Sequence, residues 1–169
     1  MSISDLLLPE FDNEIVVTRR VLERVPDDRG HWKPHDKSFP MAHLAQLVAR
    51  LPAWVNMIIA KTELDIRPKD GPAFPGYSYE TTATLLAEFD RNVAAARPVL
   101  AACSDEDFHV AWTLKAAGEP MMTTTRYGVL RSMVLNHLVH HRAQLALYLR
   151  MVDLPVPSMY GPSGDEKVG

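Results

Sequence analysis

The spacing of hydrophobic residues along the chain predicts four long amphipathic helices. In the first segment, Ser2 to Val25, apolar residues recur at steps of three and four, as they do on the buried face of a helix. A second helix is expected from Met41 to Lys61, with a kink at Pro52 because a proline inside a helix removes a hydrogen bond. A third helix is expected from an N-cap at Ser78 to about Ala102.

The last segment, Arg126 to Val152, has the strongest helical pattern. Its predicted inner face consists of Leu130, Met133, Val134, His137, His141, Gln144, Leu145 and Tyr148. Before it, Val, Trp and Thr residues flank an Ala-Gly-Glu centre in HVAWTLKAAGEPMMTTTR, which predicts a short hairpin or an irregular insert. We therefore expect an all-α protein, a four-helix bundle in which residues 1–169 form a single domain.

Composition narrows the set of partners. The formal net charge is −3 and like charges form no long runs, so no footprint for nucleic acid or for an anionic membrane surface is expected. The single cysteine, Cys103, excludes an internal disulfide framework and a cysteine-based zinc module. The N-terminal residues lack the pattern of a signal peptide, and no apolar run approaches the roughly 20 residues of a membrane span. A cytoplasmic protein without nucleic-acid or membrane partners is expected.

The stretch LNHLVHHRAQL, residues 135–145, holds three of the seven histidines within a pattern typical of a buried helix face. Burying imidazole is costly unless each ring is hydrogen-bonded, neutral or bound to a metal. His137 and His141 are one helical turn apart, so their ring nitrogens can converge on one ion. His140 lies roughly 60° from the first and roughly 100° from the second around the helix, and so it cannot easily share that ion.

A third ligand is expected from another helix that faces the same core. His43, in PMAHLAQLVARLP, is the remaining histidine in a strongly helical and apolar context. Three neutral imidazoles would leave a coordination position open for water or substrate, as in a catalytic rather than a structural site. The alternative is that these histidines are ordinary core residues with hydrogen-bond partners. The segment lacks the glutamate of the HExxH motif, so a peptidase mechanism is not expected.

Other polar residues are candidates for supporting roles. Gln144, one turn beyond the second of the paired histidines, could orient a ligand or a bound water, or form a bond between helices. Tyr160 could reach the mouth of the metal site or pack against the last helix. Arg142 is expected to point away from the histidines and to pair with a carboxylate, for which Asp165 and Glu166 of the tail are candidates.

Several of these features together resemble the DinB (YfiT-like) superfamily of bacterial metal-binding proteins. The features are the inward histidine early in the second helix, HLVHHRAQ in the last helix and the tail LPVPSMYGPSGDE. Weaker similarities are LLLPEFDNE, TRRVLERVP and WKPHDKS, so the resemblance extends over nearly the whole chain. It implies an up-down-down-up bundle, frequently a homodimer, with nickel, zinc or another divalent ion held by His43, His137 and His141.

The resemblance also implies a class of chemistry. Characterised relatives include thiol-dependent enzymes, namely a maleylpyruvate isomerase that uses mycothiol and S-transferases that use bacillithiol or similar thiols. The metal in such enzymes lowers the pKa of a bound thiol or water and so supplies a nucleophile at neutral pH. Two functions are expected: a metalloenzyme acting on a small molecule by S-transfer, isomerisation or hydrolysis, or a non-catalytic metal-binding or stress-related binding module.

Overall fold

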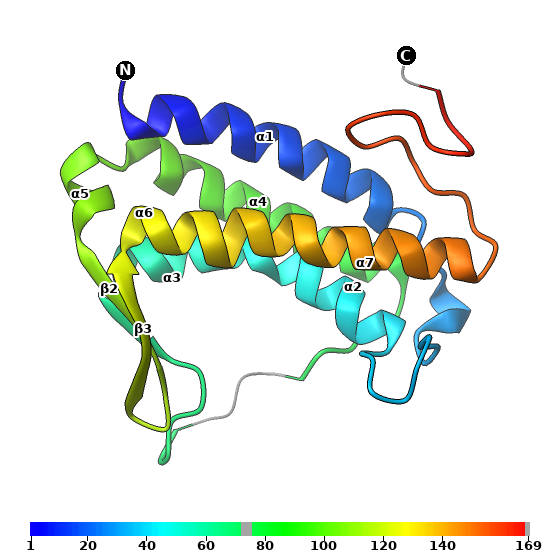
Figure 1. Ribbon diagram of the computed structural model, residues 1–169, viewed down its shortest axis with the longest axis horizontal. Helices are drawn as coiled ribbons and strands as arrows, with labels where there is room; N and C mark the ends of the chain where they lie inside the picture. The colour runs from blue at the N-terminus through cyan, green and yellow to red at the C-terminus, as the bar shows by residue number, and fades with distance from the viewer. Residues whose placement is uncertain (72–75, 168–169) are drawn as a thin grey trace.

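The computed structural model describes residues 1–71 and 76–167, and most of these residues are helical (Figure 1). The longer helices are α1 (Ile3–Leu22), α2 (Met41–Arg50), α3 (Trp54–Ala60), α4 (Thr82–Ala102) and α7 (His137–Met151). The shorter helical segments are η1 (Asp27–Arg29), η2 (Leu51–Ala53), α5 (Asp105–His109), α6 (Arg126–Val129) and η3 (Leu130–Asn136). The expectation of a mainly helical protein is confirmed.

The long helices pack side by side along the long axis of the molecule (Figure 1). Helix α1 contacts α4 and α7, and α2 contacts the same two helices. In the figure, α1 and α7 run in one direction, whereas α2 and α4 run in the other. This packing buries apolar residues from all four helices, including Leu22 of α1, Leu44 of α2, Phe89 of α4 and Leu145 of α7.

The helix starts follow local capping chemistry. At α1, the Ser2 hydroxyl accepts from the Asp5 N–H while the Asp5 carboxylate accepts from the Ser2 N–H, which forms a capping box. The expected N-cap of the third long helix at Ser78 is wrong. Thr81 is the N-cap of α4 and forms the reciprocal pair with Thr84. The N–H of Ser78 instead donates to the side chain of Gln46 on α2.

Pro52 divides the second helical segment, as expected. The α-helical geometry of α2 ends at Arg50, a 3₁₀ turn spans η2, and α3 continues from Trp54. Because the proline ring removes a backbone donor and crowds the preceding turn, the break occurs at this residue. The second long helix is therefore two helices and not one continuous helix to Lys61.

The mainly helical fold also contains a small three-stranded sheet, one strand more than the expected hairpin. The expected hairpin is confirmed: β2 (Ala111–Ala116) pairs antiparallel with β3 (Glu119–Thr125). Ala117 and Gly118, with φ of 54° and 85°, form the two-residue turn, which matches the twist of paired strands. The third strand, β1 (Glu63–Asp65), follows α3, pairs parallel with β2, and was not predicted.

The last helical segment is not a regular α-helix throughout. After α6, the segment η3 is a π-helix, and α-helical geometry resumes at His137. A π-helical turn holds more residues than an α-helical turn, so it changes which side chains face the core, and such segments are frequent near functional sites. Leu138 and Arg142 are buried in α7, while Gln144, expected on the inner face, is exposed.

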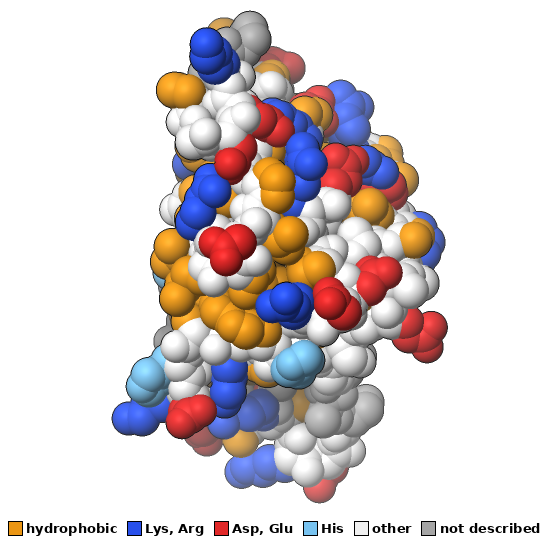
Figure 2. Space-filling view, turned by 90° about the vertical axis from the view of Figure 1, so that its right-hand side faces the viewer, with side chains coloured by type: hydrophobic (Ala, Val, Ile, Leu, Met, Phe, Trp, Pro, Cys, Tyr) orange, Lys and Arg blue, Asp and Glu red, His pale blue; other side chains and the backbone are white. Residues whose placement is uncertain are grey.

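The C-terminal tail crosses the end of the helices at which α1 and α7 finish (Figure 1). Figure 2 looks onto this end and shows a central patch of hydrophobic side chains with charged side chains around it. Val156 of the tail is buried and belongs to the core formed by α1, α2, α4 and α7. For residues 1–71 and 76–167, no helix combines the length and apolar character that crossing a membrane requires.

Candidate metal centre

The three predicted ligands lie on two helices that pack together. His43 is in the first turn of α2, which contacts α7. His137 is the first residue of α7, and His141 lies one turn later. Two backbone hydrogen bonds fix the start of α2, from Met41 N to Trp32 O at 2.8 Å and from Ala42 N to Gly30 O at 2.9 Å. These bonds hold the first turn of α2 in a defined position.

His137 and His141 point their Nε2 atoms at each other, at 2.8 Å. Two nitrogen ligands at about 2.0–2.1 Å from one ion, with angles of about 90–110° between them, lie about 2.8–3.4 Å apart. The observed separation is at the lower end of this range, and it is also the length of a hydrogen bond between the two rings. The structure therefore brings together the histidine pair that helical spacing selected, with its ring nitrogens nearly at the separation of two ligands.

Hydrogen bonding orients the second ring of this pair. His141 Nδ1 and Gln144 Oε1 are 2.8 Å apart, and the amide oxygen can only accept, so the proton is on Nδ1. In the neutral ring the lone pair is then on His141 Nε2, which accepts a hydrogen bond from the Nε2–H of His137. The expectation that Gln144 orients a ligand is consistent with this bond.

His137 carries a buried nitrogen that lacks a hydrogen bond. Its Nδ1 has no partner in normal geometry, although the Met133 carbonyl is near enough to raise the pKa of the ring. A carbonyl outside hydrogen-bond geometry does not replace a bond, so this nitrogen is unsatisfied. An unsatisfied buried polar atom of this kind is unusual in a folded protein.

His43 is held between two aromatic rings. Phe39 stacks on it with ring centroids 4.2 Å apart and an interplanar angle of 5°, and Tyr77 lies on it at 4.4 Å and 33°. The Phe39 ring is also 6.4 Å from the ring of His141. Sequence reasoning missed Phe39 and Tyr77, because both lie in loops without helical periodicity.

The three histidines share a low-polarity environment. Burial lowers the pKa of His43, and burial is also the main cause of the lowered pKa of His137 and of His141. The charges of neighbouring histidines, His43 among them, lower the pKa of His141 further, while the bond to Gln144 opposes this. The rings are therefore neutral at neutral pH, which is the state that binds metals.

Among the side chains of residues 1–71 and 76–167, no group of three His, Cys, Asp or Glu is arranged to hold a metal ion. The histidine pair is assembled on α7, and Phe39 stacks on His43 with its ring centroid 6.4 Å from that of His141. A site with all three ligands remains a prediction.

Two other candidates lie in a different cluster. The expectation that Arg142 pairs with a carboxylate is confirmed, but the candidate partners in the tail, Asp165 and Glu166, are wrong. Arg142 is buried and pairs with Glu14 of α1, with Nη1 and Oε2 2.6 Å apart. Tyr160 takes its polar contacts from these same two residues: its hydroxyl donates to Glu14 at 2.7 Å and accepts from Arg142. Asp165 pairs with Arg150 instead.

Comparison with known proteins identifies the family. The chain is similar in fold to a DinB-like protein from Bacillus cereus ATCC 10987, with a TM-score of 0.69 and 17% identity over 94% of this chain and 98% of that one. It is also similar in fold to a DinB-like protein from Bacillus subtilis, with a TM-score of 0.66 and 14% identity over 96% of this chain and 99% of that one. None of the curated proteins matches the chain. A sequence model of the DinB superfamily matches residues 10–145, and the chain therefore belongs to the DinB superfamily.

Proposed function

We propose that His43, His137 and His141 bind one divalent metal ion, nickel or zinc, in a site that serves a small-molecule reaction. The observation that carries this proposal is the 2.8 Å separation of the two Nε2 atoms on α7. The donor set suits such ions, because neutral imidazoles are common ligands of nickel and zinc. The unsatisfied Nδ1 of His137 also fits, since a turn of this ring would offer either nitrogen to an ion.

A bound ion of this kind would lower the pKa of a coordinated thiol or water, and a low-molecular-weight thiol is the proposed co-substrate. The protein's own residues prepare the site. Gln144 keeps the proton of His141 on Nδ1, and burial keeps the imidazoles neutral. Phe39 and Tyr77 restrict the plane of His43 and supply apolar walls beside it. S-transfer, isomerisation or hydrolysis of a small electrophile is the reaction class that we propose.

The remaining family properties are part of the same proposal. We infer the up-down-down-up four-helix bundle of the superfamily from the opposite directions of the paired helices in Figure 1. The proposal also includes a single domain, a homodimer and a cytoplasmic location, without nucleic-acid or membrane partners.

Metal content measured by elemental mass spectrometry on untagged protein tests the proposal. The wild-type chain, loaded with nickel or zinc and desalted, should retain one ion per chain. The His43→Ala, His137→Ala and His141→Ala variants should each lose it. His140→Ala is the matched control, because His140 is exposed and its ring lies next to the ring of His141. Full occupancy in the first three variants, or a metal-free wild type, would overturn the assignment.

A non-catalytic binding module is the second candidate. One observation favours it: among the described hydrogen bonds and ion pairs, none joins a carboxylate to His43, His137 or His141, so no general base is in place. Metal binding that raises the melting temperature, with no binding of thiols and no turnover of electrophiles, would support this alternative.

A further inference from the structure

A buried ion pair fixes α7 on the side that faces α1. Arg142 directly follows His141, and its guanidinium is almost fully buried, with 1% of the side chain exposed. Nη1 contacts the Glu14 carboxylate at 2.6 Å, the Glu14 carbonyl at 3.2 Å and the Thr18 hydroxyl at 3.1 Å. Nε is buried without a partner, so the guanidinium depends on its two terminal nitrogens for hydrogen bonds.

Tyr160 completes this pair from the tail. Its hydroxyl accepts from Nη2 of Arg142 and donates to the Glu14 carboxylate, and it therefore bridges both partners. Its ring also lies 5.2 Å from the guanidinium carbon, within the range of a cation–π contact. A residue that is 69% exposed thus supplies a hydrogen bond to one of the most buried charges in the described chain.

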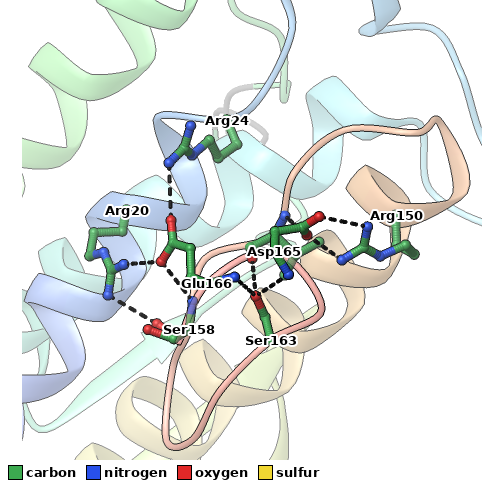
Figure 3. Close-up of polar contacts among 8 residues, drawn as sticks. Arg20, Arg24, Arg150, Ser158, Ser163, Asp165 and Glu166 are labelled. Carbon is green, nitrogen blue, oxygen red and sulfur yellow. Dashed lines mark hydrogen bonds and ion pairs between the residues drawn. The ribbon is translucent and has the colours of Figure 1, made fainter. Parts of the chain in front are cut away.

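The tail is itself held in place by a charged contact that we term the tail clasp, formed by Arg20, Arg24, Arg150, Asp165 and Glu166 (Figure 3). Glu166 pairs with Arg20 of α1 and with Arg24 just after α1, and Asp165 pairs with Arg150 of α7. The Ser163 hydroxyl accepts from the N–H groups of both acidic residues and donates to the Val156 carbonyl at 2.7 Å. The clasp thus ties the loop that carries Tyr160 to the ends of α1 and α7.

The geometry points to Tyr160 as a positioning residue for the histidine pair, held ready by the tail clasp. Adjacent residues on a helix project about 100° apart, so His141 and Arg142 lie on different sides of α7. Turning α7 about its axis would move the imidazoles and at the same time pull the guanidinium away from Glu14. The bridge from Tyr160 to Glu14 and Arg142 opposes this rotation. This inference rests on the proposed metal site for its functional meaning.

Three variants test the inference in the full-length protein. Tyr160→Phe removes only the bridging hydroxyl, and Asp165→Asn with Glu166→Gln releases the clasp. Asp12→Asn is the matched control, because it weakens another exposed two-bond ion pair on α1, with Arg97 at 2.8 Å. Two quantities are measured: titration with Co²⁺, which gives the Kd and the ligand-field absorption bands, and hydrogen–deuterium exchange over residues 137–144 without metal.

We expect Tyr160→Phe and the clasp variant to weaken Co²⁺ binding by about tenfold, the low end for groups that orient ligating histidines. Their absorption bands should shift, and amide exchange over residues 137–144 should accelerate, whereas Asp12→Asn should match the wild type. Unchanged Kd, bands and exchange in Tyr160→Phe would overturn the inference. If the wild type binds no Co²⁺, the proposed metal site fails, and exchange alone decides whether Tyr160 positions α7: faster exchange supports it and unchanged exchange overturns it.

Discussion

The Nε2 atoms of His137 and His141 lie 2.8 Å apart, and Gln144 holds the second of these rings by its other nitrogen. Both rings lie in an environment that lowers their pKa, chiefly through burial. This pair of neutral imidazoles supplies two of the three ligands of the proposed metal site. The predictions below separate the groups that orient this pair from those that only stabilise the fold.

Gln144→Leu should weaken metal binding with little effect on folding. The change removes the acceptor for His141 Nδ1, so the proton is no longer confined to that nitrogen. Loss of such a partner typically lowers metal affinity by about tenfold or more. Because Gln144 is exposed, the free energy of unfolding should change by less than about 0.5 kcal/mol. Calorimetric titration with Zn²⁺ and urea unfolding measure the two effects, and Gln144→Glu, which keeps an acceptor, should retain the affinity.

Glu14→Ala should strongly destabilise the protein. Removal of the carboxylate leaves the Arg142 guanidinium buried without its charge partner, which typically costs about 3–5 kcal/mol. The double variant Glu14→Leu with Arg142→Met removes both charges and should recover much of that loss. Urea unfolding of the two variants gives the comparison. Equal destabilisation of the single and double variants would show that packing, and not the unpaired charge, sets the cost.

The tail clasp should make stability depend on pH in the acid range. The hydrogen bond from Arg150, followed by the Val156 N–H, lowers the pKa of Asp165 from its ordinary 3.8. The Ser158 N–H is the main cause that lowers the pKa of Glu166 from its ordinary 4.5, and the charges of Arg20 and Arg24 add to it. Below these ordinary values the unfolded chain binds more protons than the folded chain, so this contribution to stability falls as the pH falls.

Melting temperatures measured between about pH 6 and pH 3 test this effect. The wild type should lose more stability across this range than the variant Asp165→Asn with Glu166→Gln, which has no carboxylates in the clasp. Above about pH 5 the wild type should be the more stable of the two. Parallel curves for the two proteins would contradict the role given to these carboxylates.

Thr81→Ala and Ser78→Ala should differ in their effect on stability. The Thr81 hydroxyl accepts from the Thr84 N–H at the start of α4, and loss of such a cap typically costs about 1 kcal/mol. Ser78 takes part through its backbone N–H, which alanine also has, so its replacement should cost less than about 0.5 kcal/mol. Urea unfolding of both variants measures the difference, and the reverse order would place the cap at Ser78.

Much of the helical structure could be predicted because its signals are local. Apolar residues at steps of three and four gave the long helices, Pro52 gave the break after α2, and Ala117 with Gly118 gave a hairpin turn. The strand β1 could not be predicted in the same way. It has three residues, and its pairing with β2 depends on contacts about fifty positions away along the chain.

The candidate site likewise has a part that the sequence predicts and a part that it does not. The proximity of His137 and His141 follows from their spacing alone, because residues one helical turn apart lie on the same side of a helix. The partners of the surrounding groups were not accessible from spacing. Spacing does not single out Glu14 among the carboxylates that Arg142 could meet, and it does not indicate that Phe39 and Tyr77 lie against His43.

The sequence by itself determined the helical segments and the histidine pair, since each depends on residues near one another in the chain, and the resemblance to the DinB superfamily, since its motifs can be recognised without knowing their contacts. The tertiary structure decided which carboxylate neutralises Arg142, which rings enclose His43 and how the tail is held. Those choices depend on packing between α1, α2, α7 and the tail, where several chemically suitable partners compete and only the arrangement of the helices selects among them.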